Sequence, residues 1–282
     1  MRKKSKTTRQ KKEQPSPAVI LEKFTDKIEE EYNVIFKPND GPQTDFLAAS
    51  EREVLYGGSA GGGKSYAMLA DPLRYMGNPA FSGLLLRHTT EELRELITKS
   101  QEMYPKIWPG IKWSERKMQW TAPSGAKLWL SYLDKDQDVT RYQGLAFSWI
   151  GFDELTQWAT PFAWSYMRSR LRSADPTLPL SMRATTNPGG RGHGWVKKMF
   201  IDPAPAGKSY IATDIETGEQ LKYPAGHEKA GRPLFKRRFI PARLKDNPYL
   251  AQQGDYEAML LSLPEQQRRQ LLDGDWDIKE GA

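Results

Sequence analysis

The sequence has no cysteine among its 282 residues and only three histidines, which lie far apart. The missing thiols exclude disulfide bonds, thiolate metal sites and cysteine nucleophiles, and the scarce imidazoles argue against a histidine metal site. Long apolar runs are also missing. None approaches the roughly 20 residues of a membrane-spanning helix, and the first residues are too polar for a signal peptide. The chemistry of the chain therefore has to come from other side chains and from the backbone.

Acidic residues are missing from the first twelve positions, which carry seven of the 42 lysines and arginines. The other 35 basic residues are matched by 35 acidic ones, so the whole net charge of +7 lies in this tail. We expect residues 1–15 to form a disordered basic tail. Such a tail either contacts nucleic acid or another acidic surface, or only keeps the chain soluble, and the net charge alone does not decide between them.

Segments that predict strands alternate with segments that predict helices along most of the chain. Strands are expected at 53–56, 82–86, 117–122, 127–133, 146–152 and 180–185, and helices at 18–32, 43–50, 65–70, 90–103 and 161–171. This alternation is typical of a mostly parallel sheet with helices on both faces, so we predict an α/β core over residues 16–200. Loops rich in proline and glycine follow, with a hairpin near 210–223 and two short helices after 247. They predict a small lid or linker subdomain over residues 201–282.

A glycine-rich run between the first predicted strand and its helix matches the phosphate-binding pattern G-x-x-x-x-G-K-[ST]. A strand that leads through such a turn into a helix aims backbone N–H groups at a polyphosphate. Lys64 would reach the β- and γ-phosphates, and the Ser65 hydroxyl would hold Mg²⁺. The flanking strand and helix argue against a merely flexible glycine loop. We expect a nucleoside triphosphate to be bound by Gly58, Ser59, Ala60, Gly61, Gly62, Gly63, Lys64 and Ser65.

Two carboxylates, Asp153 and Glu154, directly follow the predicted strand 146–152. Ligands of an α/β sheet bind beyond the carboxyl ends of its strands, where the glycine-rich loop also opens. Asp153 would hold Mg²⁺ through water, and Glu154 would polarise the attacking water. A nucleotide kinase, which passes phosphate to a substrate hydroxyl, does not need this second acid. The pair therefore favours hydrolysis.

Polar residues end the next strand as well, and Thr185, Thr186 and Asn187 could hydrogen-bond the γ-phosphate or the attacking water. An ordinary Asn-Pro-Gly turn is the alternative interpretation. Upstream of the glycine-rich loop, Gln43 could recognise adenine through its amide.

Arg141 lies in a predicted loop before Asp153 and is a candidate arginine finger for the nucleotide of its own or a neighbouring subunit. Its rivals are Arg168, Arg170 and Arg172, for which a solvated basic face is the default interpretation.

Several further segments match one family when they are taken together with these motifs. They are 41–43, 56–65, 84–87, 142–144, 152–156, 169–173, 186–190 and 274–277. Over residues 40–280 the chain resembles the ATPase domain of the large terminase subunit of tailed bacteriophages, which is the motor of DNA packaging. The set is far more specific than any single motif.

The resemblance implies a RecA-like P-loop fold of the ASCE type with a small lid, and an Mg²⁺-dependent ATPase that translocates double-stranded viral DNA into a procapsid. It implies Lys64 and Ser65 as the Walker A pair, and Asp153 and Glu154 as the Walker B metal ligand and catalytic base. Thr186 with Asn187 becomes the coupling motif, and Arg141 the leading finger candidate.

The implied partners are double-stranded DNA, the portal protein, the small terminase subunit and further copies of the chain in a pentameric ring on the portal. The implied location is the cytoplasm of the infected bacterium and, transiently, the procapsid portal, but not the mature virion.

Two departures from the family pattern limit what carries over. Many terminases have an arginine inside the glycine-rich loop, where this chain has Ser59-Ala60-Gly61-Gly62. An RNase H-like nuclease domain usually follows the ATPase domain, and this chain ends about where that domain would begin. We therefore expect no nuclease activity from the chain as it stands.

Two other functions remain open from the sequence. One is a helicase-like DNA translocase, for whose second RecA domain there is no room. The other is an assembly subunit that binds nucleotide as a switch with little turnover, against which Glu154 argues. Candidates for contacts with DNA phosphates are Arg87, Lys99, Lys197 and Lys198.

Overall fold

The structure, a computed structural model, describes residues 34–252 and 254–278. The chain divides into two units, Met1–Lys37 and Pro38–Ala282, and every helix and strand below belongs to the second. The predicted basic tail and the predicted helix at 18–32 lie outside the described residues. Within the described ranges, no helix is long and apolar enough to cross a membrane.

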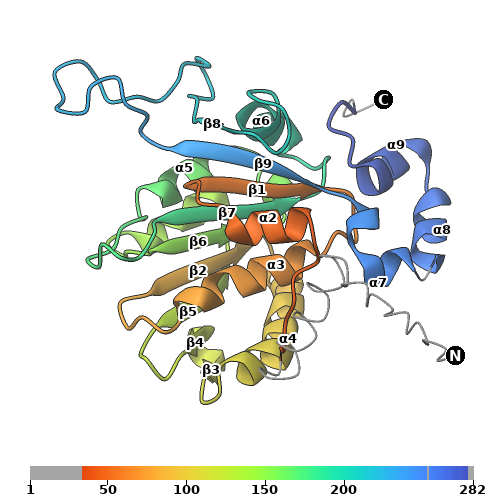
Figure 1. Cartoon of the computed structure of the whole chain (residues 1–282), viewed down its shortest axis with the longest axis horizontal. Helices are drawn as coiled ribbons and strands as arrows, with labels where there is room; N and C mark the ends of the chain where they lie inside the picture. The colour runs from red at the N-terminus through yellow and green to blue at the C-terminus, as the bar shows by residue number, and fades with distance from the viewer. Residues whose placement is uncertain (1–33, 253, 279–282) are drawn as a thin grey trace, which may run out of the picture. The chain divides into compact units, whose positions relative to one another are not determined.

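Nine strands of the described chain form one sheet in the order β3-β4-β5-β2-β6-β7-β1-β9-β8 (Figure 1). The six strands from β5 to β9 in this order are parallel, and only β3, β4 and β8 pair antiparallel at the two edges. The strands are β1 (Glu53–Gly58), β2 (Ser82–Arg87), β3 (Lys112–Ser114), β4 (Gln119–Thr121), β5 (Lys127–Tyr132), β6 (Trp149–Phe152), β7 (Ser181–Thr186), β8 (Ser209–Ile211) and β9 (Lys236–Ala242). The predicted α/β fold with a mostly parallel sheet is confirmed.

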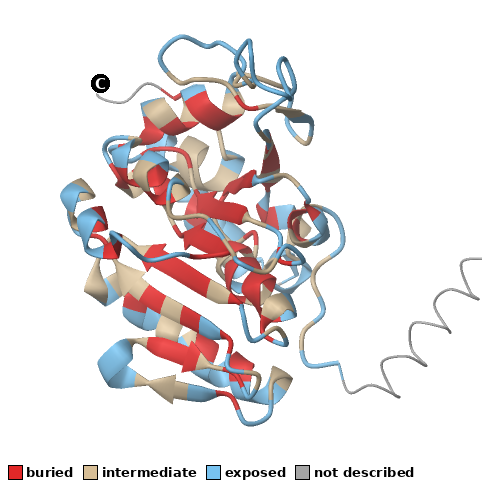
Figure 2. Ribbon diagram, turned by 90° about the vertical axis from the view of Figure 1, so that its left-hand side faces the viewer, coloured by how far each residue is buried: buried red, intermediate tan, exposed pale blue. Residues whose placement is uncertain are grey.

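Helices cover both faces of this sheet because side chains alternate along its strands. Val54 and Tyr56 of β1 pack in one cluster with Phe46 and Ala67, while Leu55 between them packs in the other with Trp164. Figure 1 accordingly shows α2 and α3 in front of the sheet and α5 behind it, and the central strands are almost wholly buried (Figure 2). The helices are α2 (Pro42–Ala48), α3 (Lys64–Ala70), α4 (Thr90–Ile107), α5 (Phe162–Arg168), α6 (His193–Val196), α7 (Pro248–Ala251), α8 (Asp255–Leu261) and α9 (Glu265–Arg268).

Local sequence signals explain several of the element boundaries. α4 begins after Thr89, whose side chain accepts from the Glu92 N–H while the Glu92 carboxylate accepts from the Thr89 N–H. This capping box satisfies donors at the helix start. The strands expected at 117–122 and 127–133 are slightly shorter, as β4 and β5, and they pair antiparallel around residues 123–125. The helix expected at 161–171 ends earlier, at Arg168.

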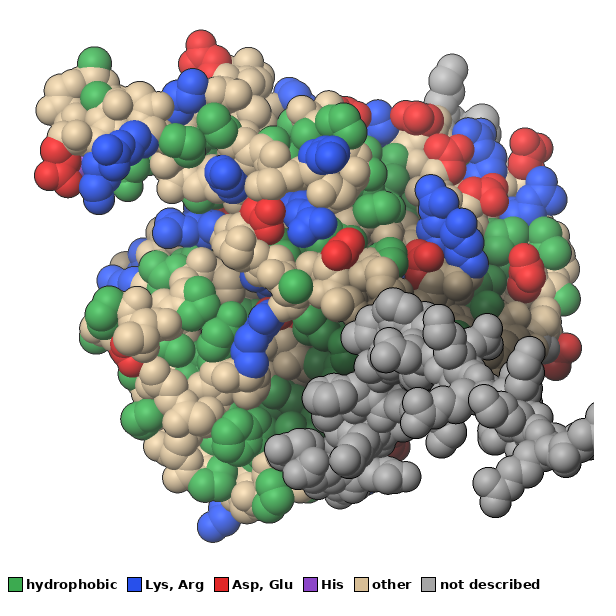
Figure 3. Space-filling view, in the orientation of Figure 1, with side chains coloured by type: hydrophobic (Ala, Val, Ile, Leu, Met, Phe, Trp, Pro, Cys, Tyr) green, Lys and Arg blue, Asp and Glu red, His purple; other side chains and the backbone are tan. Residues whose placement is uncertain are grey.

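β9 is a strand that the sequence did not lead us to expect. It lies next to β1, and its register pairs Arg237 with Glu53 and Ala242 with Gly58. Residues 201–282 therefore supply both β8 and β9 to the main sheet, and the lid expected within this segment stays a prediction. On the face drawn in Figure 3, lysines and arginines are interspersed with aspartates and glutamates.

A buried ion cluster holds the first residue of β1 in the sheet. The Glu53 carboxylate is fully buried and accepts hydrogen bonds from Arg237 Nε, at 2.6 Å, and from Arg168 Nε. Burial alone raises the pKa of Glu53, but the charges and hydrogen bonds of the two arginines outweigh it and hold the pKa below its ordinary value. The strand that leads into the glycine-rich loop is thus anchored at its far end.

Replacing Glu53 with Gln is expected to lower the free energy of unfolding by about 3–5 kcal/mol, because it leaves the buried guanidinium of Arg237 without its carboxylate. The pKa of Glu53 is lower in the folded than in the unfolded state. Its stabilisation is therefore complete above the unfolded pKa and is lost as the pH falls through the folded value. Denaturant unfolding of the wild type and of Glu53→Gln between pH 3 and 8 measures both effects. The exposed Glu115→Gln is the control, and an equal effect of both substitutions would contradict the anchoring role.

Candidate functional site

The glycine-rich loop connects β1 to α3 and depends on glycine at both of its ends. Gly58 has φ 141°, and a Cβ there would lie 2.2 Å from the Ala242 carbonyl oxygen. Gly63 has φ 73°, and a Cβ there would lie 2.8 Å from the side-chain nitrogen of Gln43. Only glycine, which has no Cβ, therefore fits where the loop passes β9 and where it enters α3.

The loop carbonyls are held from outside by three buried or half-buried side chains. Tyr56 donates to the Gly62 oxygen at 2.7 Å, Gln43 to the Gly63 oxygen at 2.9 Å, and Asn247 to the Gly61 oxygen at 2.7 Å. In a planar trans peptide the N–H of the next residue points away from the carbonyl. The N–H groups that follow these three carbonyls therefore point away from Tyr56, Gln43 and Asn247, which is the arrangement of an anion cradle.

Gln43 is engaged at both ends of its amide, since its Oε1 also accepts from the Asn39 N–H at 2.6 Å. One Nε2 hydrogen and one Oε1 lone pair are left for a base. The role in adenine recognition stays a prediction.

The beginning of the loop is bound by the last part of the described chain. The Ser59 N–H donates to the Ala242 oxygen at 2.8 Å, and the Ala60 N–H donates to the Leu271 oxygen at 2.6 Å. Leu271 belongs to η7 (Arg269–Asp273), and a Cβ on the following Gly274 would lie 2.7 Å from the Ser59 nitrogen. The segment after β9 thus packs directly on the loop.

Lys64 is buried at the start of α3 and bridges the loop to β7. Its Nζ donates to the Ser59 oxygen at 2.6 Å and to Asn187 Oδ1 at 2.7 Å. Burial lowers the pKa of Lys64, and the nearby carboxylates of Glu154 and Asp153 oppose that shift. The ammonium group therefore lies within the electrostatic reach of both carboxylates that the sequence singled out.

The strand register brings Asp153 between two other strand ends. Phe152 pairs with Leu86 of β2 and with Ala184 of β7, so the residues that follow lie side by side. Arg87 Nη1 accordingly binds Asp153 Oδ2, and the Thr185 hydroxyl binds Asp153 Oδ1. The Asp153 side chain is only 1% exposed.

Glu154 has a left-handed backbone with φ 60° and ψ 56°, which is uncommon for residues other than glycine. Burial raises the pKa of Glu154, and the adjacent Asp153 raises it further, while Lys64 and Arg87 act in the opposite direction. Conformations of this kind cluster at active sites, where the rest of the fold compensates for their cost. Glu154 is therefore a functional candidate by its backbone as well as by its charge.

A hydroxyl network joins the turn after Glu154 to the end of β7. The hydroxyls of Thr156 and Thr186 lie 2.7 Å apart, and the Thr186 hydroxyl lies 3.5 Å from Glu154 Oε2. The Thr156 hydroxyl also donates to the Asn187 carbonyl at 3.2 Å. Thr186 and Asn187 thus contact the Glu154 turn on one side and, through Asn187, Lys64 on the other.

The arginines that the sequence suggested as fingers lie elsewhere. Arg141, in η3 (Asp136–Tyr142), is 42% exposed and donates to carbonyls of its own neighbourhood, Asp138 and Tyr132. Arg168 binds Glu53 at the opposite end of β1, so it cannot serve this site. The arginine that does contact the site is Arg87, which the sequence suggested only for DNA. Its position after the apolar run Leu84-Leu85-Leu86, at a strand end, was the signal that could have placed it here.

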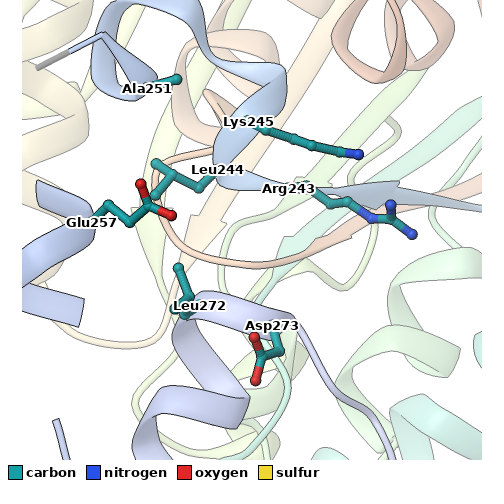
Figure 4. Close-up of a pocket in the computed structure, with 7 residues that line it drawn as sticks. All are labelled: Arg243, Leu244, Lys245, Ala251, Glu257, Leu272 and Asp273. Atoms are coloured by element: carbon teal, nitrogen blue, oxygen red, sulfur yellow. The ribbon is translucent and has the colours of Figure 1, made fainter. Parts of the chain in front are cut away.

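A pocket of about 430 Å³ lies beside the loop, between η6 (Leu244–Asp246), α8 and η7 (Figure 4). Leu244, one of its lining residues, is also the neighbour that a Cβ on Gly61 would meet. Arg243 and Lys245 extend to the same side, away from Glu257. Two cations therefore follow β9 at the same sheet edge as the glycine-rich loop.

Oxygen donors at this edge fit Mg²⁺ that arrives with a nucleotide. Ser65 provides a hydroxyl in the first turn of α3, and Asp153 a carboxylate at the end of β6. The part of the chain that the structure describes contains no cluster of three His, Cys, Asp or Glu residues able to hold a metal alone. Magnesium bound through one or two protein oxygens and substrate phosphates does not need such a cluster.

Comparisons with known proteins identify a family and a fold. The family model described as terminase large subunit, T4likevirus-type, N-terminal, matches residues 55–282. No curated protein matches the chain. The large terminase of a thermophilic bacteriophage, in complex with ADP, has a similar structure, with a TM-score of 0.59, 15% identity and 85% of this chain covered. The chain spans about half of that protein, 54% of its length. The large terminase ATPase domain of Thermus phage P74-26 is similar with a TM-score of 0.53 and 12% identity, over 89% of this chain and 98% of that domain.

Proposed function

The chain belongs to the family of T4-like terminase large subunits, of which it matches the N-terminal part, and from this premise we propose that it hydrolyses ATP to drive double-stranded viral DNA into a procapsid. The observation that carries the proposal is the meeting of Lys64, Asn187, Asp153 and Glu154 at one edge of the sheet. Nucleotide complexes of a relative support it, because the large terminase of the thermophilic bacteriophage binds ADP and ATP-γ-S.

Each residue has one role in the proposed reaction. The N–H groups from Gly62 to Ser65 bind the phosphates, whereas those of Ser59 and Ala60 donate to the Ala242 and Leu271 carbonyls. Lys64 exchanges its bonds to Ser59 and Asn187 for bonds to phosphate oxygens. Mg²⁺, when bound, neutralises charge that develops on the phosphates. Ser65 and Asp153 would hold it.

Glu154 takes a proton from the attacking water as the general base. Burial and Asp153 make its carboxylate more basic, while Lys64 and Arg87 limit that effect and favour the charged form that can accept the proton. Asn187, released by Lys64, is free to report the state of the γ-phosphate to the Thr156–Thr186 network.

Arg141 is exposed in η3, where it donates to the carbonyls of Asp138 and Tyr132 and lies 3.7 Å from the Asp138 carboxylate. It therefore fits a finger offered to the site of a neighbouring copy rather than to its own.

The proposed partners are double-stranded DNA, the portal protein, the small terminase subunit and further copies of the chain in a ring, which would be pentameric on the portal. The proposed location is the cytoplasm of the infected bacterium and, transiently, the procapsid portal. Lys99 and Lys197, two of the suggested DNA contacts, pair with Glu95 and with Asp202 and Asp277. The DNA surface is therefore not assigned to them.

ATP hydrolysis measured over a range of protein concentrations, with and without linear double-stranded DNA, tests the proposal. We expect the turnover per chain to rise with concentration, because a finger from a neighbour completes the site, and to rise further with DNA. Single-stranded DNA is the control, and a preference for it would favour the helicase-like alternative. Turnover that is negligible under every condition, with ADP still bound, would favour the nucleotide switch.

A further inference from the structure

Arg87 is half-buried at the end of β2, where its guanidinium binds the carboxylate that the proposed function gives to a metal ion. Its side chain is 13% exposed, and its Nη1 binds Oδ2 of Asp153. The register of β2 and β6 enforces this contact, because Leu86 pairs with Phe152 one position earlier. A cation therefore already sits on the carboxylate that would face Mg²⁺.

A second carboxylate lies on the other side of the same guanidinium. Glu92 Oε2 is 3.7 Å from Arg87 Nε, and that Nε is buried without a hydrogen-bond partner. A shift of about 1 Å would bring the two atoms within the range of a charge-assisted hydrogen bond. Arg87 is thus hydrogen-bonded to one carboxylate through Nη1 and only close to the other.

Glu92 is held in place to receive it. Its Oε2 accepts from the N–H and hydroxyl of Thr89 at 3.3 and 3.0 Å, and its Oε1 accepts from the Gln157 side chain at 2.6 Å. Gln157 ends η4 (Leu155–Gln157), the turn that begins at Glu154. Glu92 is therefore hydrogen-bonded, through Gln157, to the turn that begins at the proposed general base Glu154.

A guanidinium and a divalent cation on the same buried carboxylate repel each other, since little water screens them. We propose that Arg87 is a positioning residue that holds Asp153 until Mg²⁺ binds, and that Glu92 then receives its guanidinium. This inference rests on the proposed function, because it assumes that Asp153 faces the metal. It assigns Arg87 to the metal site instead of to DNA.

The test is the Mg²⁺ concentration that gives half-maximal ADP binding, measured by titration calorimetry on the full chain at pH 8. Arg87→Met removes the competing cation and is expected to lower this concentration roughly tenfold. Glu92→Gln keeps the capping box, since glutamine also serves there, but weakens the acceptor and is expected to raise it several-fold. In the double variant Arg87→Met/Glu92→Gln, the second substitution should have no further effect on the Mg²⁺ concentration, because there is no guanidinium for Glu92 to accept. The exposed Arg94→Met on α4 is the matched control.

A half-saturating Mg²⁺ concentration that is unchanged or higher in Arg87→Met would overturn the inference. An effect of Glu92→Gln that persists in the double variant would overturn the role of Glu92. Should Arg87→Met fail to fold, as judged by thermal unfolding without Mg²⁺, Arg87→Gln replaces it. Glutamine is polar but carries no charge, so the predicted fall in the Mg²⁺ requirement remains, and its absence counts against the inference. Wild-type ADP binding that does not depend on Mg²⁺ would also overturn the inference, whereas a lack of ADP binding at every Mg²⁺ concentration would reject the proposed function itself.

Discussion

Replacing Lys64 with Ala is expected to reduce the turnover of ATP at least about 100-fold, the loss typical when a preorganised group that stabilises transition-state charge is removed. Lys64 is the buried cation that bridges the glycine-rich loop and Asn187, and it is the residue of α3 that we propose meets the phosphates. Phosphate release at saturating Mg²⁺ and ATP measures the effect. ADP binding should weaken as well, because the ammonium is proposed to contact phosphates that both nucleotides carry.

Two further variants test whether the loss of turnover in Lys64→Ala is caused by the missing ammonium group at this position. Lys106→Ala removes an exposed lysine of α4 and should leave turnover unchanged. Lys64→Arg keeps the charge, but its planar fork does not fit where one small ammonium bridges Ser59 and Asn187, so it should be nearly as inactive as Lys64→Ala. Turnover of Lys64→Ala within twofold of the wild type would remove Lys64 from the mechanism.

Replacing Glu154 with Gln should leave nucleotide binding intact and lower turnover about 100- to 10,000-fold, which is the contribution expected of a general base. Glutamine is isosteric and accepts the same left-handed backbone, so the fold should be preserved. Single-turnover measurements should show ATP bound and uncleaved, while calorimetry shows ATP affinity equal to or above that of the wild type.

The exposed Glu91→Gln on α4 serves as the control for loss of one carboxylate. Asp153→Asn gives a second comparison, because loss of the metal ligand should weaken binding that depends on Mg²⁺, whereas loss of the base should not. Equal turnover of Glu154→Gln and the wild type would show that another group activates the water.

The features of the candidate site that lie within a single short segment of the chain could be predicted from local sequence patterns. The spacing from Gly58 to Ser65 and the pair Asp153-Glu154 each lie within a few residues of a strand end, so the sequence contains the whole signal. The parallel sheet could be predicted for the same reason, since most strands and helices of the core have a recognisable local pattern. The order of the strands in the sheet could not be predicted in this way.

What the sequence could not predict depends on that order. Arg87 lies 66 residues before Asp153, and only the adjacency of β2 and β6 makes them partners. β9 was missed because Lys236, Arg237 and Arg238 resemble a solvated segment and Pro241 a strand breaker. Arg237 is nevertheless buried, because Glu53, 184 residues earlier, neutralises it. A buried charge of this kind can be recognised only when its partner is known.

The attachment of the glycine-rich loop to the end of the chain also sets an order of events during synthesis. Ser59 leaves the ribosome early, but the carbonyl that fixes its N–H belongs to Ala242, and the amide that holds Gly61 belongs to Asn247, 186 residues later. β1 itself lies between β7 and β9, two strands that are translated long after it. Contacts of such sequence separation form late in folding. The loop that would bind the nucleotide is therefore the first motif to be made and among the last to take shape, so a nascent chain cannot hold ATP until nearly all of this unit has been translated.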